Sequence, residues 1–465
     1  MHGSRSSWMV VASLGLLIVP ATRGQKLGNS LEQKAKSGDV GAMLKIAHAY
    51  ESGTGTPADP AEAARWYEHA ANAGDPWAQT KLAMLYLQGT GVTKDLHEAI
   101  RWLERAASNG YGIAQFRLGL AYLHGDGVTR DDAEGVHWLR EAAEKNIPDA
   151  EANLGVLFLT GRAVAKSYPD AMQWSLRAAK HGSAFAECNL GTMYELGHGV
   201  VRDPRTAESW YRRAADKGSA EGEYRLGRLL AVESSANFSE AATWLRRAAD
   251  DGNVPAQFSV GLLYAQGRGV QQNEETAAKW YRLAAQSGSP EAQLNLGSLY
   301  ESGRGVGQDT AEAVHWYLEA AKNGLVAAEW NVGVAYEIGA GVAQDYVKAR
   351  YWYLQGAEAG DHNAQNSLGH LLYAGLGGSR DRQQAVKWLT AAADNGDAHA
   401  ALNLGIVLSD PEASDSDRIA ALTWLEVARQ RGLEPGPALA TLAAQLSPSE
   451  TEAARRNAAA WVSSH

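Results

Sequence analysis

Apolar residues recur along the chain in a pattern that predicts pairs of short helices. In residues 74–109, a first stripe at i, i+4, i+5, i+7 and i+8 consists of Ala78, Leu82, Ala83, Leu85 and Tyr86. This spacing places side chains on one face of an amphipathic helix. A second stripe follows and consists of Ala99, Trp102, Ala106 and Ala107. The segment therefore predicts two consecutive helices, each with one face directed into a core.

Glycine and aspartate mark the ends of these helices. Gly89 and Gly91 follow the first stripe and Gly110 follows the second. Glycine adopts the positive φ of a tight helix exit without strain. Asp95 precedes the second stripe, where its carboxylate can accept hydrogen bonds from the free amides of the first turn. The predicted unit is helix, loop, helix and turn.

The same unit recurs along most of the chain, as its tryptophans show. They follow one another at 36 residues, except for one step of 34 between Trp210 and Trp244, and they are Trp66, Trp102, Trp138, Trp174, Trp210, Trp244, Trp280, Trp316, Trp352, Trp388 and Trp424. A fixed period of this length is typical of a solenoid, in which each unit packs only on its neighbours.

Small residues recur at one position of the first helix in each unit. Ala47 and Ala83 occupy it in the first two units, and then come Gly119, Gly155, Gly191, Gly227, Gly261, Gly297, Gly333, Gly369 and Gly405. Glycine inside a helix costs about 1 kcal/mol relative to alanine, so a bulky group must approach the backbone there. We expect the recurring tryptophan to be that group. A second aromatic series, also interpreted as packing, consists of Tyr50, Tyr86, Tyr122, Phe158, Tyr194, Tyr264, Tyr300 and Tyr336.

These motifs resemble the Sel-one-like repeat, a relative of the tetratricopeptide repeat. The match is close from Gln293 through Gly303-Arg304-Gly305-Val306 to Trp316 and Gly324. The resemblance implies an all-α fold, a right-handed α/α superhelix of about eleven units over residues 38–432, with the first helix of each pair on the concave face. Residues 25–37 and 433–465 are expected to cap the two ends. The loop around residues 231–238 is shorter, and Ala163 replaces the second loop glycine.

Composition narrows the possible functions. The net charge is -10, which argues against a nucleic-acid partner because phosphate binding requires clustered basic residues. Residues 1–24 have a basic start, an apolar run and small residues after it, as a cleaved secretory signal has. A frayed N-terminal helix is the alternative. We expect a periplasmic or secreted protein without a stable membrane span in the mature chain.

Motifs for catalysis and cofactor binding are absent from the sequence. It has no Gly-x-Ser-x-Gly elbow, zinc-binding His-Glu-x-x-His helix or phosphate-binding loop. Cys188 is the single cysteine and is expected to be a buried, inert thiol. We therefore expect no enzymatic activity, no cofactor and no metal. The alternative is a secreted β-lactamase-like hydrolase of the same repeat family, but the chain has neither Ser-x-x-Lys nor Lys-Thr-Gly.

A polar position two residues before the helix glycine is the candidate peptide-binding site. Arg117 and Arg225 occupy it in two units, and asparagine occupies it at Asn153, Asn189, Asn295, Asn331 and Asn403. Asparagine is a poor helix former, and its amide can pair with the backbone of an extended peptide. Related tetratricopeptide proteins bind peptides with similar asparagines. The alternative is that each asparagine bridges to the helix of a neighbouring unit.

Taken with the resemblance, these features predict an exported scaffold, adaptor or regulator. It would bind a protein or peptide on the concave face of the solenoid. Trp77, Phe185 and Trp330 come early in first helices and are further candidate anchors, since tryptophan is enriched in interface hot spots.

Overall fold

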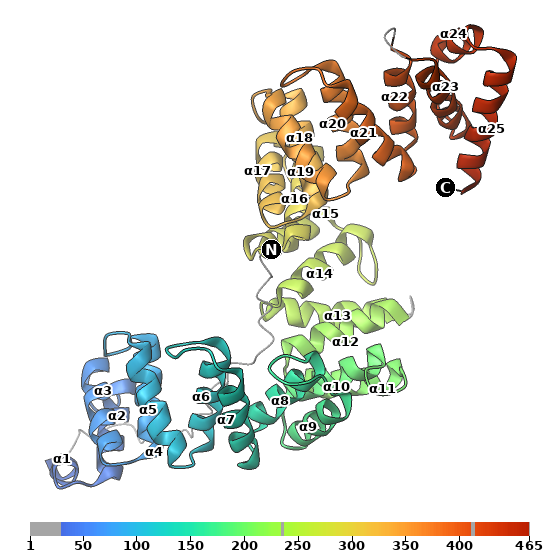
Figure 1. Cartoon of the computed structure of the whole chain (residues 1–465). Coiled ribbons are helices and arrows are strands. Elements are labelled where there is room, and N and C mark those ends of the chain that lie inside the picture. Colours follow the sequence, from blue (N-terminus) through green and yellow to red (C-terminus); the bar gives the residue numbers. More distant parts are fainter. Residues whose placement is uncertain (1–28, 234–236, 411–413, 465) are drawn as a thin grey trace. The chain divides into compact units, whose positions relative to one another are not determined.

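The computed structural model describes residues 29–233, 237–410 and 414–464, and this part of the chain is helical without a β-strand (Figure 1). The predicted all-α fold is confirmed. The expected signal segment, residues 1–24, lies outside the described residues, as does the start of the expected N-terminal cap. Among the described helices, none combines the length and the apolar character that crossing a bilayer requires.

Two compact units divide the chain, Met1–Ser235 and Ala236–His465. The helices of the first unit are α1 (Asn29–Lys36), α2 (Val40–Ser52), α3 (Pro60–Asn72), α4 (Pro76–Gln88), α5 (Leu96–Ser108), α6 (Gly112–His124), α7 (Asp132–Glu144), α8 (Pro148–Thr160), α9 (Tyr168–Lys180), α10 (Ala184–Leu196), α11 (Pro204–Asp216) and α12 (Ala220–Glu233).

The second unit continues with the same kind of element. Its helices are α13 (Phe238–Asp250), α14 (Val254–Gln266), α15 (Glu274–Gln286), α16 (Pro290–Ser302), α17 (Thr310–Lys322), α18 (Val326–Ile338), α19 (Tyr346–Glu358), α20 (His362–Ala374), α21 (Arg382–Asp394), α22 (Ala398–Leu408), α23 (Asp415–Gln430), α24 (Pro437–Gln445) and α25 (Pro448–Ser464).

Consecutive helices pack as hairpins in both units. The pairs are α2 with α3 through α10 with α11 in the first unit, and α14 with α15 through α22 with α23 in the second. We call the first helix of each pair the inner helix and the second the outer helix. Inner helices also contact the next inner helix, as α8 does α10 and α18 does α20. This contact is expected where inner helices line the concave side of a stack.

The helix ends follow the predicted chemistry. Gly89 and Gly91 both have a φ of 72°, and the amide of Gly89 donates to the carbonyl of Leu85 at 2.8 Å. The Asp95 carboxylate accepts from the amide of Glu98 at 3.0 Å. The left-handed exit and the aspartate cap together fix where α4 stops and where α5 begins.

The group beside the helix glycine is not the tryptophan, so that prediction is wrong. It is the residue that follows the tryptophan in the chain. A Cβ on Gly297 would lie 2.6 Å from Cε1 of Tyr317, and the same relation joins Gly119 to Leu139, Gly155 to Ser175, Gly191 to Tyr211, Gly261 to Tyr281, Gly333 to Tyr353, Gly369 to Leu389 and Gly405 to Leu425.

The helical twist explains this difference. Successive residues of an α-helix point about 100° apart, so Trp316 and Tyr317 serve different contacts. Tyr317 is buried against its own inner helix, whereas Trp316 is half-buried and packs on a core cluster formed by α15 and α16. The tryptophans therefore pack where one hairpin meets the next. Trp102, which is 4% exposed, is fully buried.

A buried glutamine joins each of several inner helices to the outer helix before it. Nε2 of Gln79 donates to the carbonyl of Ala71 at 3.0 Å. Gln115, Gln257, Gln293 and Gln365 make the same bond to the carbonyl eight residues earlier. This joint was not predicted from the sequence, although the glutamine follows the same period as the tryptophans.

Glutamate replaces glutamine at this position in Glu151, Glu187, Glu223 and Glu329. Basic residues hold the first two. Glu187 is completely buried, and its carboxylate lies 2.8 Å from Nη2 of Arg213 and 3.0 Å from Nζ of Lys217. Glu151 is likewise buried and lies 2.6 Å from Nε of Arg177. These cations come from the following outer helix or its end, so each ion pair connects the inner and the outer helix of one hairpin.

The last hairpin is followed by α24 and α25. Ser447 caps α25, since its hydroxyl accepts from the amide of Glu450 at 3.3 Å and its own amide donates to the Glu450 carboxylate at 2.8 Å. This is a capping box. Trp461 of α25 packs edge-to-face on Trp424 of α23, with ring centroids 5.4 Å apart. These helices thereby cover apolar surface of the last outer helix.

Candidate functional site

A cavity of about 880 Å³ lies along the inner helices of the first unit. We call it the inner groove. Its lining comes mainly from α4, α6, α8, α10 and α12 and from the loops that follow α6, α8 and α10. Five successive helices thus contribute to one continuous site, because α12, which begins the next repeat and contacts α10, extends the row of inner helices. The elements that carry the site can be followed in Figure 1.

Leucine and valine side chains form the apolar part of the inner groove. Leu120, Val156, Leu159 and Leu196 line it. Leu196 is 56% exposed, although Leu190 and Met193 of the same inner helix are buried. An exposed leucine beside further apolar groups is the kind of surface that a partner covers. The groove can therefore accept apolar side chains.

Two arginines lie deep in the inner groove, at the middle of inner helices. Arg117 of α6 is 9% exposed, and burial lowers the pKa of its guanidinium, while the charge of Asp149 partly opposes that shift. Arg225 of α12 donates to Glu221 at 2.5 Å and to the Thr192 hydroxyl at 3.1 Å. Both arginines thus have neighbouring acids that neutralise part of their charge.

Two further cations lie on the loop after α8 and are exposed. Nη2 of Arg162 donates to the carbonyl of Leu123 at 3.4 Å. Nζ of Lys166 lies 4.8 Å from the ring centre of Tyr168, and that ring stacks on His198 with centroids 5.3 Å apart. Within the described part of the chain, neither Arg162 nor Lys166 has an ion-pair partner. These two charges are available to a ligand.

Two polar nitrogens of the groove are buried without a hydrogen-bond partner among the described residues. They are Nδ2 of Asn189 and Nδ1 of His198. A buried polar atom that lacks a partner is costly. An amide nitrogen can only donate, so an acceptor atom from a ligand would satisfy Asn189.

The predicted asparagines do not form a single site. Asn189 lines the inner groove together with Arg117 and Arg225, which occupy the same repeat position. Asn153 is completely buried, and its Nδ2 donates to the carbonyl of Asp149 at 2.7 Å. The groove thus contains one asparagine of the predicted set, and peptide binding by the set stays a prediction.

The remaining asparagines lie in the second unit and are half-buried. Nδ2 of Asn331 donates to the carbonyl of Ala327 at 3.3 Å, within its own helix. Nδ2 of Asn403 donates to Oδ1 of Asn366 on α20 at 2.8 Å. Asn403 therefore bridges two successive inner helices, as the alternative interpretation expects. Asn295 is half-buried on α16.

Of the three apolar anchor candidates, Trp77 is the most exposed, at 36%. Phe185 is half-buried against a core cluster. Trp330 is half-buried, and its Nε1 donates to the hydroxyl of Ser367 at 3.2 Å. Phe185 and Trp330 thus already pack within the solenoid.

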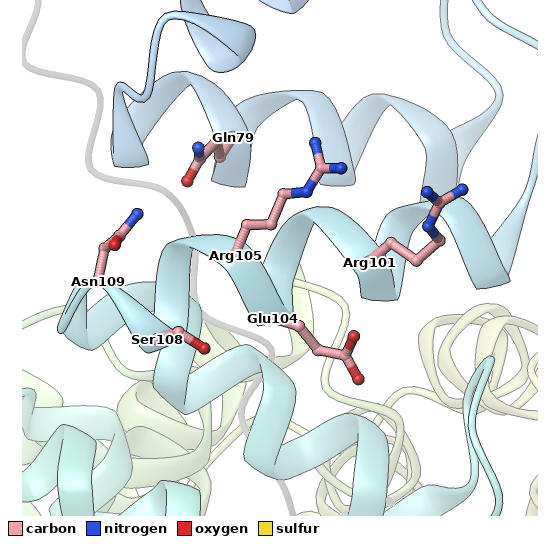
Figure 2. A pocket seen from close by; sticks show the side chains of 6 residues that line it. All are labelled: Gln79, Arg101, Glu104, Arg105, Ser108 and Asn109. Carbon is pink, nitrogen blue, oxygen red and sulfur yellow. The ribbon is translucent and has the colours of Figure 1, made fainter.

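A second, smaller hollow of about 460 Å³ lies over α5 and is polar. Figure 2 shows Arg101 and Arg105 projecting on the same side of α5, with Glu104 on the other side. Arg101 lies 2.8 Å from Glu98, and the Arg105 guanidinium lies 4.5 Å from the ring centre of Trp102. Its cations already have partners, so this hollow is the weaker candidate.

The described residues offer little for catalysis. Cys188 is 2% exposed, and burial raises the pKa of its thiol to about 12, so the thiolate that would be nucleophilic is not formed near neutral pH. The expected burial of this thiol is confirmed. Within residues 29–233, 237–410 and 414–464, histidine, cysteine and acidic side chains do not gather in a group that could hold a metal ion.

Comparison with known families gives one match, and it covers most of the chain. The model of the Sel1 repeat matches ten segments, residues 40–75, 78–111, 112–147, 148–183, 184–219, 220–253, 254–289, 290–325, 326–361 and 362–397. These segments contain the inner groove. Among curated proteins, none matches the chain.

Two solved structures share the fold over much of their length. One is c5321, described as a protective antigen of uropathogenic Escherichia coli with an SLR fold. It is 29% identical, the match covers 95% of each chain, and the TM-score is 0.65. The other is a Sel1 repeat protein from Oxalobacter formigenes, which is 33% identical over 66% of this chain and 90% of that one, with a TM-score of 0.51.

Proposed function

Because the chain belongs to the Sel1 repeat family, we propose that it is an exported scaffold that binds a protein or peptide along its inner helices. Sel1 solenoids are typical of scaffolds for protein–protein interaction. The proposal goes further in assigning the binding surface and the location outside the cytoplasm.

The observation that carries the proposal is the inner groove itself. It combines an apolar part that includes Leu196 with cationic side chains, and two of its polar nitrogens lack partners in the described part of the chain. Apolar contact area with a few fixed polar groups is the usual composition of a binding site. The groove also runs across several inner helices, as an extended segment of a partner requires.

Export is supported by two further observations. Residues 1–24 have the composition of a secretory signal. The Escherichia coli relative, which aligns over 95% of this chain, is described as a protective antigen. Fractionation of cells that produce the full chain or a chain without residues 1–24 tests this point. We expect the full chain outside the cytoplasm and the truncated chain inside it, and equal cytoplasmic retention of both would contradict export.

Site-specific photocrosslinking tests the binding surface. A benzophenone amino acid at position 196 is expected to capture a partner polypeptide in cells that express the full chain. The control position is Leu176, which is 44% exposed on the outer helix α9 and lies outside the groove. Capture at both positions alike, or at neither, would contradict binding in the groove. Turnover of the β-lactam nitrocefin by purified protein would instead favour the hydrolase alternative.

A further inference from the structure

We propose that the inner groove selects an extended acidic peptide segment whose carboxylates alternate with apolar side chains. This inference rests on the proposed scaffold function and adds the chemistry of the partner. Three independent features of the groove carry it, namely its charge, its unsatisfied donor and its apolar surface.

The charge of the groove is opposite to that of the chain. Four cationic residues line it, Arg117, Arg162, Lys166 and Arg225, against one acidic residue, Asp126, which gives a formal +3 (4 minus 1) with neutral histidines. The whole chain carries -10. Complementary charge attracts a partner and rejects like-charged competitors. An acidic segment is therefore drawn to this groove and repelled by most of the remaining surface.

The cations differ in how much charge they can offer. Asp149 and Glu221 partly neutralise Arg117 and Arg225. Arg162 and Lys166 stand on the loop after α8 without an ion-pair partner in the described residues. Carboxylates of a ligand should therefore meet Arg162 and Lys166 first. Since these two side chains are exposed, their contribution should weaken as salt is added.

The deep part of the groove contains a hydrogen-bond donor that needs an acceptor. Among the residues that the structure describes, Nδ2 of Asn189 is buried and lacks a hydrogen-bond partner, and no proton shift can turn an amide nitrogen into an acceptor. A peptide carbonyl or a carboxylate of the ligand would accept a hydrogen bond from this nitrogen. This requirement is separate from the attraction of charge, so it can be tested separately.

The apolar lining distinguishes a peptide from other anions. Leu120, Val156, Leu159 and Leu196 lie among the cations, and a free phosphate or a nucleic-acid backbone would leave them in contact with water. An extended peptide places successive side chains on opposite sides, so it can direct apolar groups to these residues and acidic groups to the loop. An anionic lipid surface would satisfy the charges but would not enter a concave groove.

Selection from a random library of 12-residue peptides on the immobilised full chain tests the inference. We expect the selected peptides to contain at least twice the library's share of Asp and Glu, together with leucine-like residues. Arg162→Glu with Lys166→Glu should abolish this acidic bias. The matched control, Lys94→Glu with Lys180→Glu, makes the same charge change at exposed residues outside the groove and should leave it intact. Circular dichroism checks that both variants fold.

The outcomes separate this inference from the scaffold function. Selection of neutral or basic peptides that crosslink to position 196 would overturn the acidic chemistry and leave the scaffold function standing. If no peptide is selected in a groove-dependent way, both are overturned. Charge-dependent binding to phosphatidylglycerol vesicles in place of peptides would overturn the inference in favour of a lipid surface.

The role of Asn189 has its own readout. Asn189→Ala should weaken binding of a selected, fluorescein-labelled peptide by about tenfold, the usual effect of losing one hydrogen bond in a buried site. The thermal midpoint should not fall, because this amide nitrogen has no hydrogen bond to lose within the described part of the chain. Equal affinity of the variant and the wild-type chain would remove Asn189 from the site.

Discussion

Tyr317 fills the space that a side chain on Gly297 would need. A Cβ at position 297 would lie 2.6 Å from Cε1 of Tyr317. The same phenol donates from its hydroxyl to the Glu301 carboxylate at 2.8 Å. The ring is thus held against the inner helix along its edge and at its tip, which leaves it little freedom to move away from a larger residue at 297.

Gly297→Ala should therefore destabilise the second unit. Alanine favours a helix by about 1 kcal/mol over glycine, but overpacking a filled core costs about 1–3 kcal/mol. We expect a net loss of about 1 kcal/mol in chemical denaturation. Ala47 occupies the equivalent position in the first hairpin, so a hairpin can be built around alanine. The double change Gly297→Ala with Tyr317→Leu should recover part of the loss, and a more stable single variant would contradict this packing.

Loss of the cations beside Glu187 should leave a buried charge uncompensated. Arg213→Met with Lys217→Met removes both ion-pair partners of a carboxylate that is completely buried. We expect a loss of about 2–3 kcal/mol in the free energy of unfolding. Adding Glu187→Gln should restore most of it, because glutamine at this position of other hairpins bonds to a backbone carbonyl. Failure of this rescue would mean that the cations stabilise by packing instead.

Ala163 has a φ of 63°, in a region where a side chain is strained. Other loops carry glycine here, and a Cβ on Gly127 would lie 2.6 Å from the carbonyl oxygen of Leu96. Ala163→Gly should therefore raise the free energy of unfolding by about 0.5–1 kcal/mol, since relief of strain exceeds the added entropy of the unfolded chain. A lower denaturation midpoint would show that the methyl group contributes more through packing than it costs in strain.

The free energy of unfolding should fall at alkaline pH because the phenol of Tyr281 is buried. It is 3% exposed, and burial raises the pKa of its phenol to about 12. Between about pH 10 and that value the unfolded chain loses this proton while the folded chain keeps it. The stabilisation is complete below pH 10 and falls by about 1.4 kcal/mol per pH unit through this window.

Tyr281→Phe should flatten the alkaline decline by that amount, as measured by urea denaturation from pH 9 to pH 12. Tyr351→Phe is the matched control, because Tyr351 is 56% exposed and its change should leave the slope as it is. Parallel slopes for all three proteins would contradict the burial of the Tyr281 phenol.

Asn403 should stabilise the fold by bridging two helices. Its Nδ2 donates to Asn366 of the preceding inner helix. Asn403→Ala should lower the free energy of unfolding by about 1 kcal/mol and leave peptide affinity unchanged. Reduced affinity without reduced stability would restore Asn403 to the predicted binding set.

Much of the fold was predictable because its signals are local. Gly89, Gly91 and Asp95 act on the backbone beside them, so their spacing alone predicts where helices stop and start. The contact of the helix glycine was not predictable in this way. Trp316 and Tyr317 both lie at positions that recur with the 36-residue period. The period shows that these positions are constrained, but it does not show which helix each side chain contacts.

The inner groove was less accessible to sequence reasoning. Arg162 and Lys166 lie on one loop, and Arg117 and Arg225 lie on inner helices far apart in the chain. They meet because successive inner helices are stacked, and the repeat pattern alone does not reveal which hairpins enclose a cavity. The repeat position of Asn189 did give a usable signal, although Asn153 at the same position is buried and Asn403 serves a helix bridge.

The glutamine joint connects residues that are only eight positions apart, such as Gln79 and Ala71. A segment of one repeat length, taken from one glutamine joint to the next, contains a glutamine donor near its start and an acceptor carbonyl near its end. Whole hairpins can then be duplicated or deleted without leaving an unmatched end inside the stack. The length of the inner surface can therefore change in steps of one hairpin during evolution or by design. The length of polypeptide that it can hold changes with it.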